Sequence, residues 1–127
     1  MNSGETRWPV ELRLKRAEKL LEITFDDGSS FRLPAEYLRV ESPSAEVQGH
    51  GPGQKTIVAG RAHVGIIAIE PVGNYAVRLS FDDLHDTGIY SWAYLYQLGL
   101  EYAERWRKYL DALAERGLSR EPARGGG

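Results

Sequence analysis

Alternating apolar and polar residues in the first third of the chain predict a small antiparallel sheet. From Val10 the segment VELRL alternates as a half-buried strand does, and LLEITF (Leu20–Phe25) predicts the return strand. The segment DDGSS that follows is a hairpin signal, because glycine accepts the positive backbone angle that such turns demand. FRL then predicts a short third strand. Pro34 suits the first turn of a helix, so AEYLRV is expected to be a short helix.

The second half of the chain shows a similar pattern. The segment VGIIAIEPV is apolar enough for a buried strand, Gly73–Asn74 can turn the chain, and YAVRLSF alternates cleanly. Ser91 is expected to cap a helix, and we expect a break or kink at Gly99. One stripe of this amphipathic helix is apolar or aromatic and consists of Trp92, Leu95, Tyr102, Trp106, Tyr109 and Leu113.

Two stretches of the chain match each other. Phe25-Asp26-Asp27 aligns with Phe81-Asp82-Asp83 and, after one extra residue, Tyr37-Leu38 aligns with Tyr94-Leu95. Each half is therefore expected to run from a strand through an acidic turn and a short extended piece into a helix. The sequence predicts an α+β fold of small mixed or antiparallel sheets, built from two related strand–turn–helix units, with a C-terminal amphipathic helix.

The length of 127 residues suits one domain. We expect a flexible N-terminus over residues 1–9, a single domain over residues 10–116 and a disordered tail over residues 117–127. Residues 41–63 are rich in glycine and include two prolines, which predicts a long loop that is either functional or a mobile connector.

Composition and charge exclude several classes of protein. The chain has no cysteine, which excludes disulfides, cysteine zinc sites, thiol catalysis and directly ligated iron–sulfur clusters. The formal net charge of −2 lacks the basic excess of nucleic-acid binders. No apolar run approaches the ~20 residues that span a bilayer, and no apolar core of a secretory signal is present. We therefore expect a cytoplasmic protein that binds neither nucleic acid nor membrane.

The acidic segment FDDLHD has two interpretations. Asp82, Asp83, His85 and Asp86 are metal-ligating types, and His50 or His63 could add a distant ligand. Adjacent side chains on a strand point to opposite faces, however, which separates His85 from Asp86. The first copy of the segment has the acidic turn without the histidine. A solvated turn, with His85 bonded to a backbone carbonyl, is therefore favoured over a metal site formed by His85 and Asp86.

The segment GHGPGQKT resembles a phosphate-binding loop. Gly49, Lys55 and Thr56 match the pattern, but Gln54 occupies the position of the second glycine, and the following IVAG does not predict a helix. An anion or partner contact through the backbone N–H groups of this loop stays open beside a mobile connector.

No catalytic set of residues is evident in the sequence. The chain has no G-x-S-x-G motif, and Ser91 has only the sequence-near His85 beside it. Aromatic residues are crowded into the C-terminal third. Most are expected in or near the core, and a surplus could mark a partner surface.

Three longer stretches resemble a known family. LEITFDDGSSFRLPAEYLR, EVQGHGPGQ and VGIIAIEPVGNYAVRLSFDDLHDTGIYSWAYLYQLG are similar to the small N-terminal domain of gamma-butyrobetaine hydroxylase, which also occurs alone as a bacterial family of unknown function. The similarity spans Val10 to Leu113. It implies a small α+β fold with two related units.

The resemblance also bears on function. The hydroxylase domain carries a structural zinc held by cysteines and a histidine, and this cysteine-free chain cannot hold it in that way. The oxygenase chemistry belongs to a separate, larger domain, so the resemblance implies an accessory module rather than a 2-oxoglutarate enzyme. Relatives fused to P-loop ATPases that resemble iron–sulfur cluster carriers make cluster assembly an implied context.

The sequence thus favours a non-enzymatic accessory or protein-interaction module with an unidentified protein partner and no cofactor. A rival hypothesis is a small-ligand or metal-binding protein with weak or unknown enzymatic activity that uses His85, Asp86 and His50. Self-association through the aromatic face is a third hypothesis. The predicted interaction residues are His50, Gly51, Gly53, Gln54, His85, Asp86, Tyr90 and Trp92.

Overall fold

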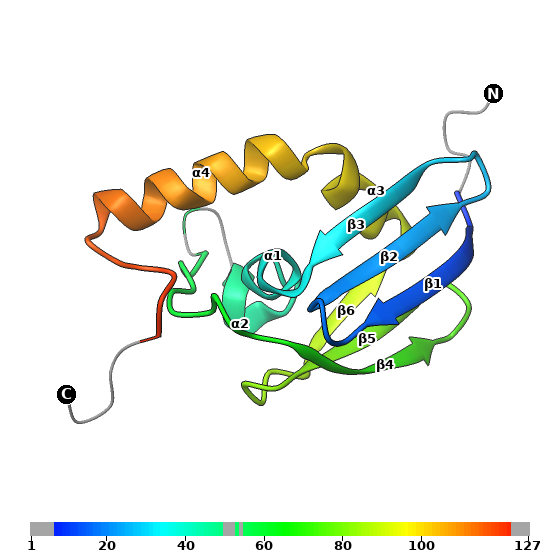
Figure 1. Cartoon of the computed structure of the whole chain (residues 1–127), viewed down its shortest axis with the longest axis horizontal. Helices are drawn as coiled ribbons and strands as arrows, with labels where there is room; N and C mark the ends of the chain where they lie inside the picture. The colour runs from blue at the N-terminus through cyan, green and yellow to red at the C-terminus, as the bar shows by residue number, and fades with distance from the viewer. Residues whose placement is uncertain (1–6, 50–52, 54, 123–127) are drawn as a thin grey trace.

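Two three-stranded antiparallel sheets and four helices form the part of the chain that the structure describes (Figure 1). The computed structural model describes residues 7–49, 53 and 55–122. The first sheet contains β1 (Pro9–Lys15), β2 (Leu20–Phe25) and β3 (Ser30–Pro34), and the second contains β4 (Ile66–Val72), β5 (Ala76–Phe81) and β6 (Gly88–Ser91). The helices are α1 (Ala35–Val40), α2 (Ala45–Gln48), α3 (Trp92–Leu100) and α4 (Tyr102–Glu115). This confirms the predicted α+β fold.

The strands form where the apolar alternation predicts them. In β2, Leu21, Ile23 and Phe25 are at most 1% exposed, while the residues between them are half-buried. Gly28 has a φ of 88° in the turn between β2 and β3, which is the left-handed conformation that the hairpin signal requires. The middle strand of the sheet therefore presents one fully apolar face to the core.

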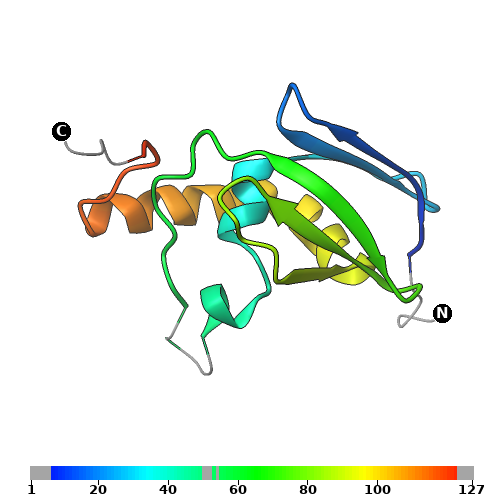
Figure 2. The ribbon, with the colours of Figure 1, turned by 90° about the horizontal axis from the view of Figure 1, so that it is seen from below.

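Both sheets contribute to one core. Leu21, Ile23 and Phe25 of the first sheet belong to the same buried cluster as Leu79 and Phe81 of the second. A second, smaller cluster lies where α4 projects beyond the sheets (Figures 1 and 2). Its buried members are Val40, Val47, Val58, Tyr109 and Leu113.

The second cluster includes two residues of the segment 41–63, for which the sequence left a functional loop and a mobile connector open. Val47 and Val58 are buried, and the segment contains the short helix α2, which the sequence pattern did not predict. The Ser44 side chain accepts a hydrogen bond from the backbone N–H of Glu46 and so caps this helix. Four residues are too few to show a helical period, which is why the pattern missed them.

The two halves contact each other in a reciprocal way. The Tyr37 hydroxyl donates to the carbonyl oxygen of Leu98 at 2.7 Å, and the Tyr94 hydroxyl donates to that of Glu41 at 2.6 Å. Tyr37 and Tyr94 are equivalent in the sequence repeat. The hydroxyl of each tyrosine bonds the carbonyl oxygen of the residue that lies four positions after the other tyrosine in the chain. The two units are therefore related by an approximate two-fold axis.

A second pair of contacts follows the same symmetry. A Cβ atom on Gly99 would lie 2.4 Å from the Phe31 ring, and a Cβ atom on Gly88 would lie 2.5 Å from Ser42 Oγ. Phe31 and Gly88 are equivalent in the repeat, as are Ser42 and Gly99. Each of these two contacts therefore pairs a glycine with a larger residue. In one contact the glycine is Gly99 of α3, and in the other it is Gly88 of β6.

The predicted break in the C-terminal helix exists, but not at Gly99. That glycine lies inside α3, because its lack of a side chain makes room for Phe31. The break falls at Glu101, whose φ of −103° and ψ of 15° depart from helical values. The glycine therefore serves packing rather than termination.

The first residues of the expected disordered tail contact the rest of the domain. The backbone N–H groups of Gly60 and Ala62 donate to the carbonyl oxygens of Ser119 and Arg120. The Arg120 guanidinium also binds both carboxylate oxygens of the buried Glu36, at 2.7 and 2.8 Å. A buried carboxylate needs such a partner, which sequence polarity does not reveal. Residues 123–127 lie outside the described part of the chain.

Candidate functional site

The acidic segment between β5 and β6 is a tight turn, as the sequence favours. The backbone N–H of Phe81 donates to His85 O, and that of Leu84 donates to Phe81 O. The Asp83 carboxylate accepts the N–H of His85 at 3.1 Å. The first half of the chain repeats all three bonds, with Ser29 in the place of His85. We name residues 82–86 the acidic turn.

Leu84 is the unusual residue of this turn. It occupies the place of Gly28 in the first copy and adopts the same backbone conformation, with a φ of 75° against 88°. The left-handed region costs a residue with a Cβ atom roughly 1–2 kcal/mol. The Leu84 side chain is nevertheless 89% exposed, so no packing in the monomer offsets that cost.

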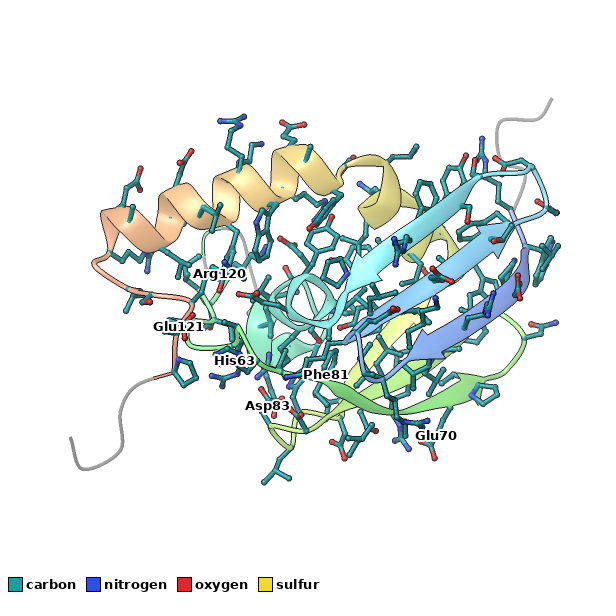
Figure 3. All side chains as sticks on the ribbon, viewed as in Figure 1. His63, Glu70, Phe81, Asp83, Arg120 and Glu121 are labelled. Carbon is teal, nitrogen blue, oxygen red and sulfur yellow. The ribbon has the colours of Figure 1, made fainter. Side chains whose placement is uncertain are left out.

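Two arginines hold the acidic turn in place. Arg39 Nε donates to Asp83 Oδ2 at 2.7 Å, and Arg61 Nε donates to the same oxygen at 2.6 Å. We name these three residues the arginine–aspartate cluster; they come from α1, the acidic turn and the segment before β4. Asp83 lies at the lower edge of the molecule in Figure 3, on the same side as His63. The cluster therefore ties three separate parts of the chain together.

Burial and hydrogen bonds act on the pKa of Asp83 in opposite directions. Burial raises the pKa of this carboxyl, but the hydrogen bonds from Arg39 and from the His85 N–H outweigh it, and the pKa is lowered. Asp83 is therefore ionised at neutral pH and carries the charge that the arginines require.

His85 lies under the turn and bonds two side chains, not the expected backbone carbonyl. Its Nε2 atom is 2.9 Å from Ser42 Oγ, and its Nδ1 atom is 3.0 Å from Glu46 Oε1. Burial, followed by the charge of Arg39, lowers the pKa of His85 and favours the neutral ring. A neutral ring then donates a hydrogen bond from Nδ1 to Glu46 and accepts one at Nε2 from the Ser42 hydroxyl.

Ser42, His85 and Glu46 have the order of contacts found in a catalytic triad. A nucleophile must be reachable by its substrate, however, and Ser42 is 0% exposed. Its Oγ atom also lies against Gly88, where a Cβ would approach it to 2.5 Å, and it accepts the N–H of Ser44. The arrangement therefore serves to anchor the acidic turn on the segment before α2.

Two open cavities adjoin the segment 56–58. The first, of about 470 Å³, lies against α4 and has a floor that includes Val40, Ile57 and Tyr109. Charged side chains that line this cavity are already paired with one another, since both Lys55 and Arg105 bind the buried Glu41 at 3.0 Å. The second, of about 480 Å³, adjoins the same segment. Its lining includes Arg39, Glu46, Thr56, Ala59, Arg61 and His85.

The crowded tyrosines are structural. The hydroxyls of Tyr37, Tyr90, Tyr94 and Tyr109 each donate to a backbone carbonyl. Burial raises the pKa of Tyr94 and of Tyr109 to about 12. These phenols therefore stay protonated at neutral pH, and they account for much of the aromatic surplus without a partner surface.

The described members of the predicted interaction set differ in burial. Tyr90 is 0% exposed and His85 is buried, whereas Gly53 and Asp86 are exposed. Trp92 is half-buried, and its Nε1 atom donates to the carbonyl oxygen of Asn74. The remaining predicted residues, His50, Gly51 and Gln54, lie outside the described residues, so a role for them stays a prediction.

The metal hypothesis receives no support from the geometry. His85 is buried and Asp86 exposed, as opposite faces predict. Within residues 7–49, 53 and 55–122, no three histidine, aspartate or glutamate side chains come together as a metal site. In the same part of the chain, no helix combines the length and apolar character needed to cross a bilayer.

Sequence reasoning missed Arg39, Arg61, Ser42 and Glu46. Arg39 and Arg61 meet Asp83 across 44 and 22 positions of sequence, and no periodic pattern connects residues so far apart. The one local signal was Arg39 itself, a cation in the short apolar helix AEYLRV.

Together the fold and the turn define a small two-sheet α+β domain with two related halves. The chain belongs to the family described as gamma-butyrobetaine hydroxylase-like, N-terminal, whose model matches residues 12–96. This confirms the resemblance seen in the sequence. No protein with a curated function matches the chain significantly.

Solved structures share this fold. Two solution structures determined by NMR are 45% and 48% identical to the chain, with TM-scores of 0.82 and 0.81. The first alignment covers 95% of each chain, and the second covers 98% of this chain and 92% of the other. A crystal structure of a protein of unknown function in the DUF971 family, from Acidithiobacillus ferrooxidans, is 41% identical over 72% of this chain and 91% of its own, with a TM-score of 0.61.

Proposed function

We propose that the domain is a non-enzymatic interaction module that binds a partner protein through the acidic turn, with Leu84 as the central apolar contact. The observation that carries this proposal is the left-handed conformation of an almost fully exposed leucine. Backbone strain is concentrated at functional sites, where a gain elsewhere offsets it. Burial of Leu84 against a partner supplies that gain.

The turn is built to present this side chain rigidly. Asp83 is fixed by Arg39 and Arg61, and His85 is fixed by Ser42 and Glu46. A contact that is already ordered loses little conformational entropy on binding. The rigid base under Leu84 therefore favours its use as an anchor.

Charge around the turn indicates the chemistry of the partner. Asp82 and Asp86 flank Leu84 and are exposed, whereas the charge of Asp83 is neutralised by the two arginines. Interfaces commonly combine an apolar centre with a complementary charged rim. The partner surface that fits is an apolar recess bordered by lysine or arginine side chains. As the setting we propose the cytoplasm and, from the family resemblance alone, iron–sulfur cluster assembly.

The variant Leu84→Gly separates binding from folding. Glycine relieves the left-handed strain, so we expect the free energy of unfolding to rise by about 0.5–1 kcal/mol, measured by urea denaturation. Loss of the apolar anchor is expected to weaken partner binding by about tenfold or more. Binding is measured first by capture from the native host and then with the purified partner.

Leu100→Ala is the matched control, since Leu100 is also exposed, at 65%, but ends α3. It is expected to leave both stability and binding nearly unchanged. Equal binding by the wild type and Leu84→Gly, or capture of no specific partner by the wild type, would contradict the proposal. A captured protein counts in its favour only if Leu84→Gly releases it and Leu100→Ala retains it.

A further inference from the structure

We propose that the second cavity is a binding site for a small oxyanion, a carboxylate or phosphate group, held by Arg39 and Arg61. This site lies beneath the acidic turn and is independent of the partner protein proposed above. It can therefore be tested on the purified chain alone.

The first observation is a buried guanidinium nitrogen without a partner. Arg39 is 8% exposed, and its Nη1 atom is buried with no hydrogen-bond partner among the described residues. A buried charged donor without an acceptor is costly, and such an atom in a native protein calls for a ligand or another explanation. Arg39 lines the second cavity, so an oxyanion there would place negative charge beside this incompletely paired guanidinium.

The second observation is an excess of positive charge. Arg39 and Arg61 share one oxygen of one carboxylate, Asp83 Oδ2, while Asp83 Oδ1 accepts the backbone N–H of His85. Asp83 thus balances only one of the two guanidinium charges. Glu46 is the other carboxylate at this cavity, but its side chain is 66% exposed, so water and salt screen it.

The remaining lining suits an oxyanion. Thr56 contributes a hydroxyl group that can donate, and Arg61 Nη1 is fixed by the carbonyl oxygen of Ala59 at 2.9 Å. Guanidinium groups bind carboxylate and phosphate through paired N–H donors, and such charge-assisted hydrogen bonds are stronger than hydrogen bonds between neutral groups. A volume of about 480 Å³ leaves ample room for either group.

Two-dimensional NMR tests the site directly. Inorganic phosphate and acetate are titrated separately into the protein, with chloride adjusted to hold the ionic strength constant. We expect saturable shifts of the Nε–H signals of Arg39 and Arg61 and of the amides of Thr56 and Ala59. The anion that saturates at the lower concentration identifies the preferred chemistry.

Variants decide whether the shifts come from this cavity. Arg61→Gln is expected to weaken binding by about tenfold or more, because it removes one guanidinium. Arg39→Lys keeps the charge but loses the paired donors, and it is expected to weaken binding as well. Arg78→Gln is the control, since Arg78 is exposed and pairs with Glu70 on the second sheet. It should bind as the wild type does.

Two results would overturn the proposal. One is a shift that stays linear up to ~0.1 M anion, the ionic strength at which exposed charges are already screened beyond about 10 Å. The absence of saturation there indicates an adventitious ion only. The other is equal saturable binding by Arg61→Gln and Arg78→Gln, which places the anion elsewhere. Arg61 is the decisive position because its side chain is 33% exposed, so its replacement leaves the core intact.

Discussion

Replacing Asp83 with alanine is expected to lower the free energy of unfolding by about 3 kcal/mol, measured by urea denaturation. The variant leaves Arg39, which is 8% exposed, without its one acceptor among the described residues. Breaking a buried ion pair by removing one partner is strongly destabilising, because the remaining charge stays buried and unpaired. The loss of the hydrogen bond to the His85 N–H also loosens the acidic turn.

Asp86→Ala is the matched control for this prediction. Asp86 lies in the same turn but is exposed, so its replacement is expected to change stability by no more than about 0.5 kcal/mol. If Asp83→Ala costs no more than Asp86→Ala, the arginine–aspartate cluster does not stabilise the fold. A double-mutant cycle with Arg39→Met then isolates the energy of the pair.

The lowered pKa of Asp83 gives the same prediction a pH dependence. A carboxyl whose pKa is lower in the folded state stabilises the protein at pH values above its unfolded pKa. That stability is lost as the pH falls through the folded pKa. Below about pH 4, where an unfolded aspartate begins to take up a proton, the wild type should lose stability faster than Asp83→Ala does. Parallel decline of both proteins would contradict the role assigned to Asp83.

The substitution Gly99→Ala is expected to destabilise the protein by about 2 kcal/mol, although alanine is the better helix former by about 1 kcal/mol. The new Cβ would lie 2.4 Å from Cγ of Phe31. That ring packs edge-on against Phe25 and Tyr96, with centroids 6.1 and 5.5 Å away, so it has little freedom to yield. Urea denaturation measures the change.

Removal of the Phe31 ring supplies the control. In a Phe31→Ala background the space beside Gly99 opens, and only the helix propensity remains. Gly99→Ala should therefore become neutral or stabilising, by up to about 1 kcal/mol. A cost that persists in this background would show that contacts other than the Phe31 ring exclude the side chain.

The sequence predicted the parts of the fold that local patterns encode. The alternation in LLEITF and the glycine at position 28 are local signals, and β2 and its turn follow them. The helix break moved from Gly99 to Glu101, because a contact with Phe31, distant in sequence, decides what that glycine does. Local patterns thus predicted where the strands and helices lie, but not the tertiary contacts that require a particular residue at a given position.

The candidate site was less predictable than the fold. Aspartates in the turn were interpreted correctly, since the repeat showed the same turn without a histidine. The partners of Asp83 and His85 could not be found in this way, because Arg39, Arg61 and Ser42 come from other parts of the chain. The strain at Leu84 is visible only in the backbone.

The reciprocal contacts of Tyr37 and Tyr94 are those of a homodimer whose two subunits have been joined into one chain. In a homodimer, each substitution alters both copies of a turn at once. A fused chain escapes that constraint: one copy can retain the relaxed glycine while the other carries a strained, protruding leucine. Fusion of two equivalent halves thus allows a symmetric framework to display a single, one-sided contact.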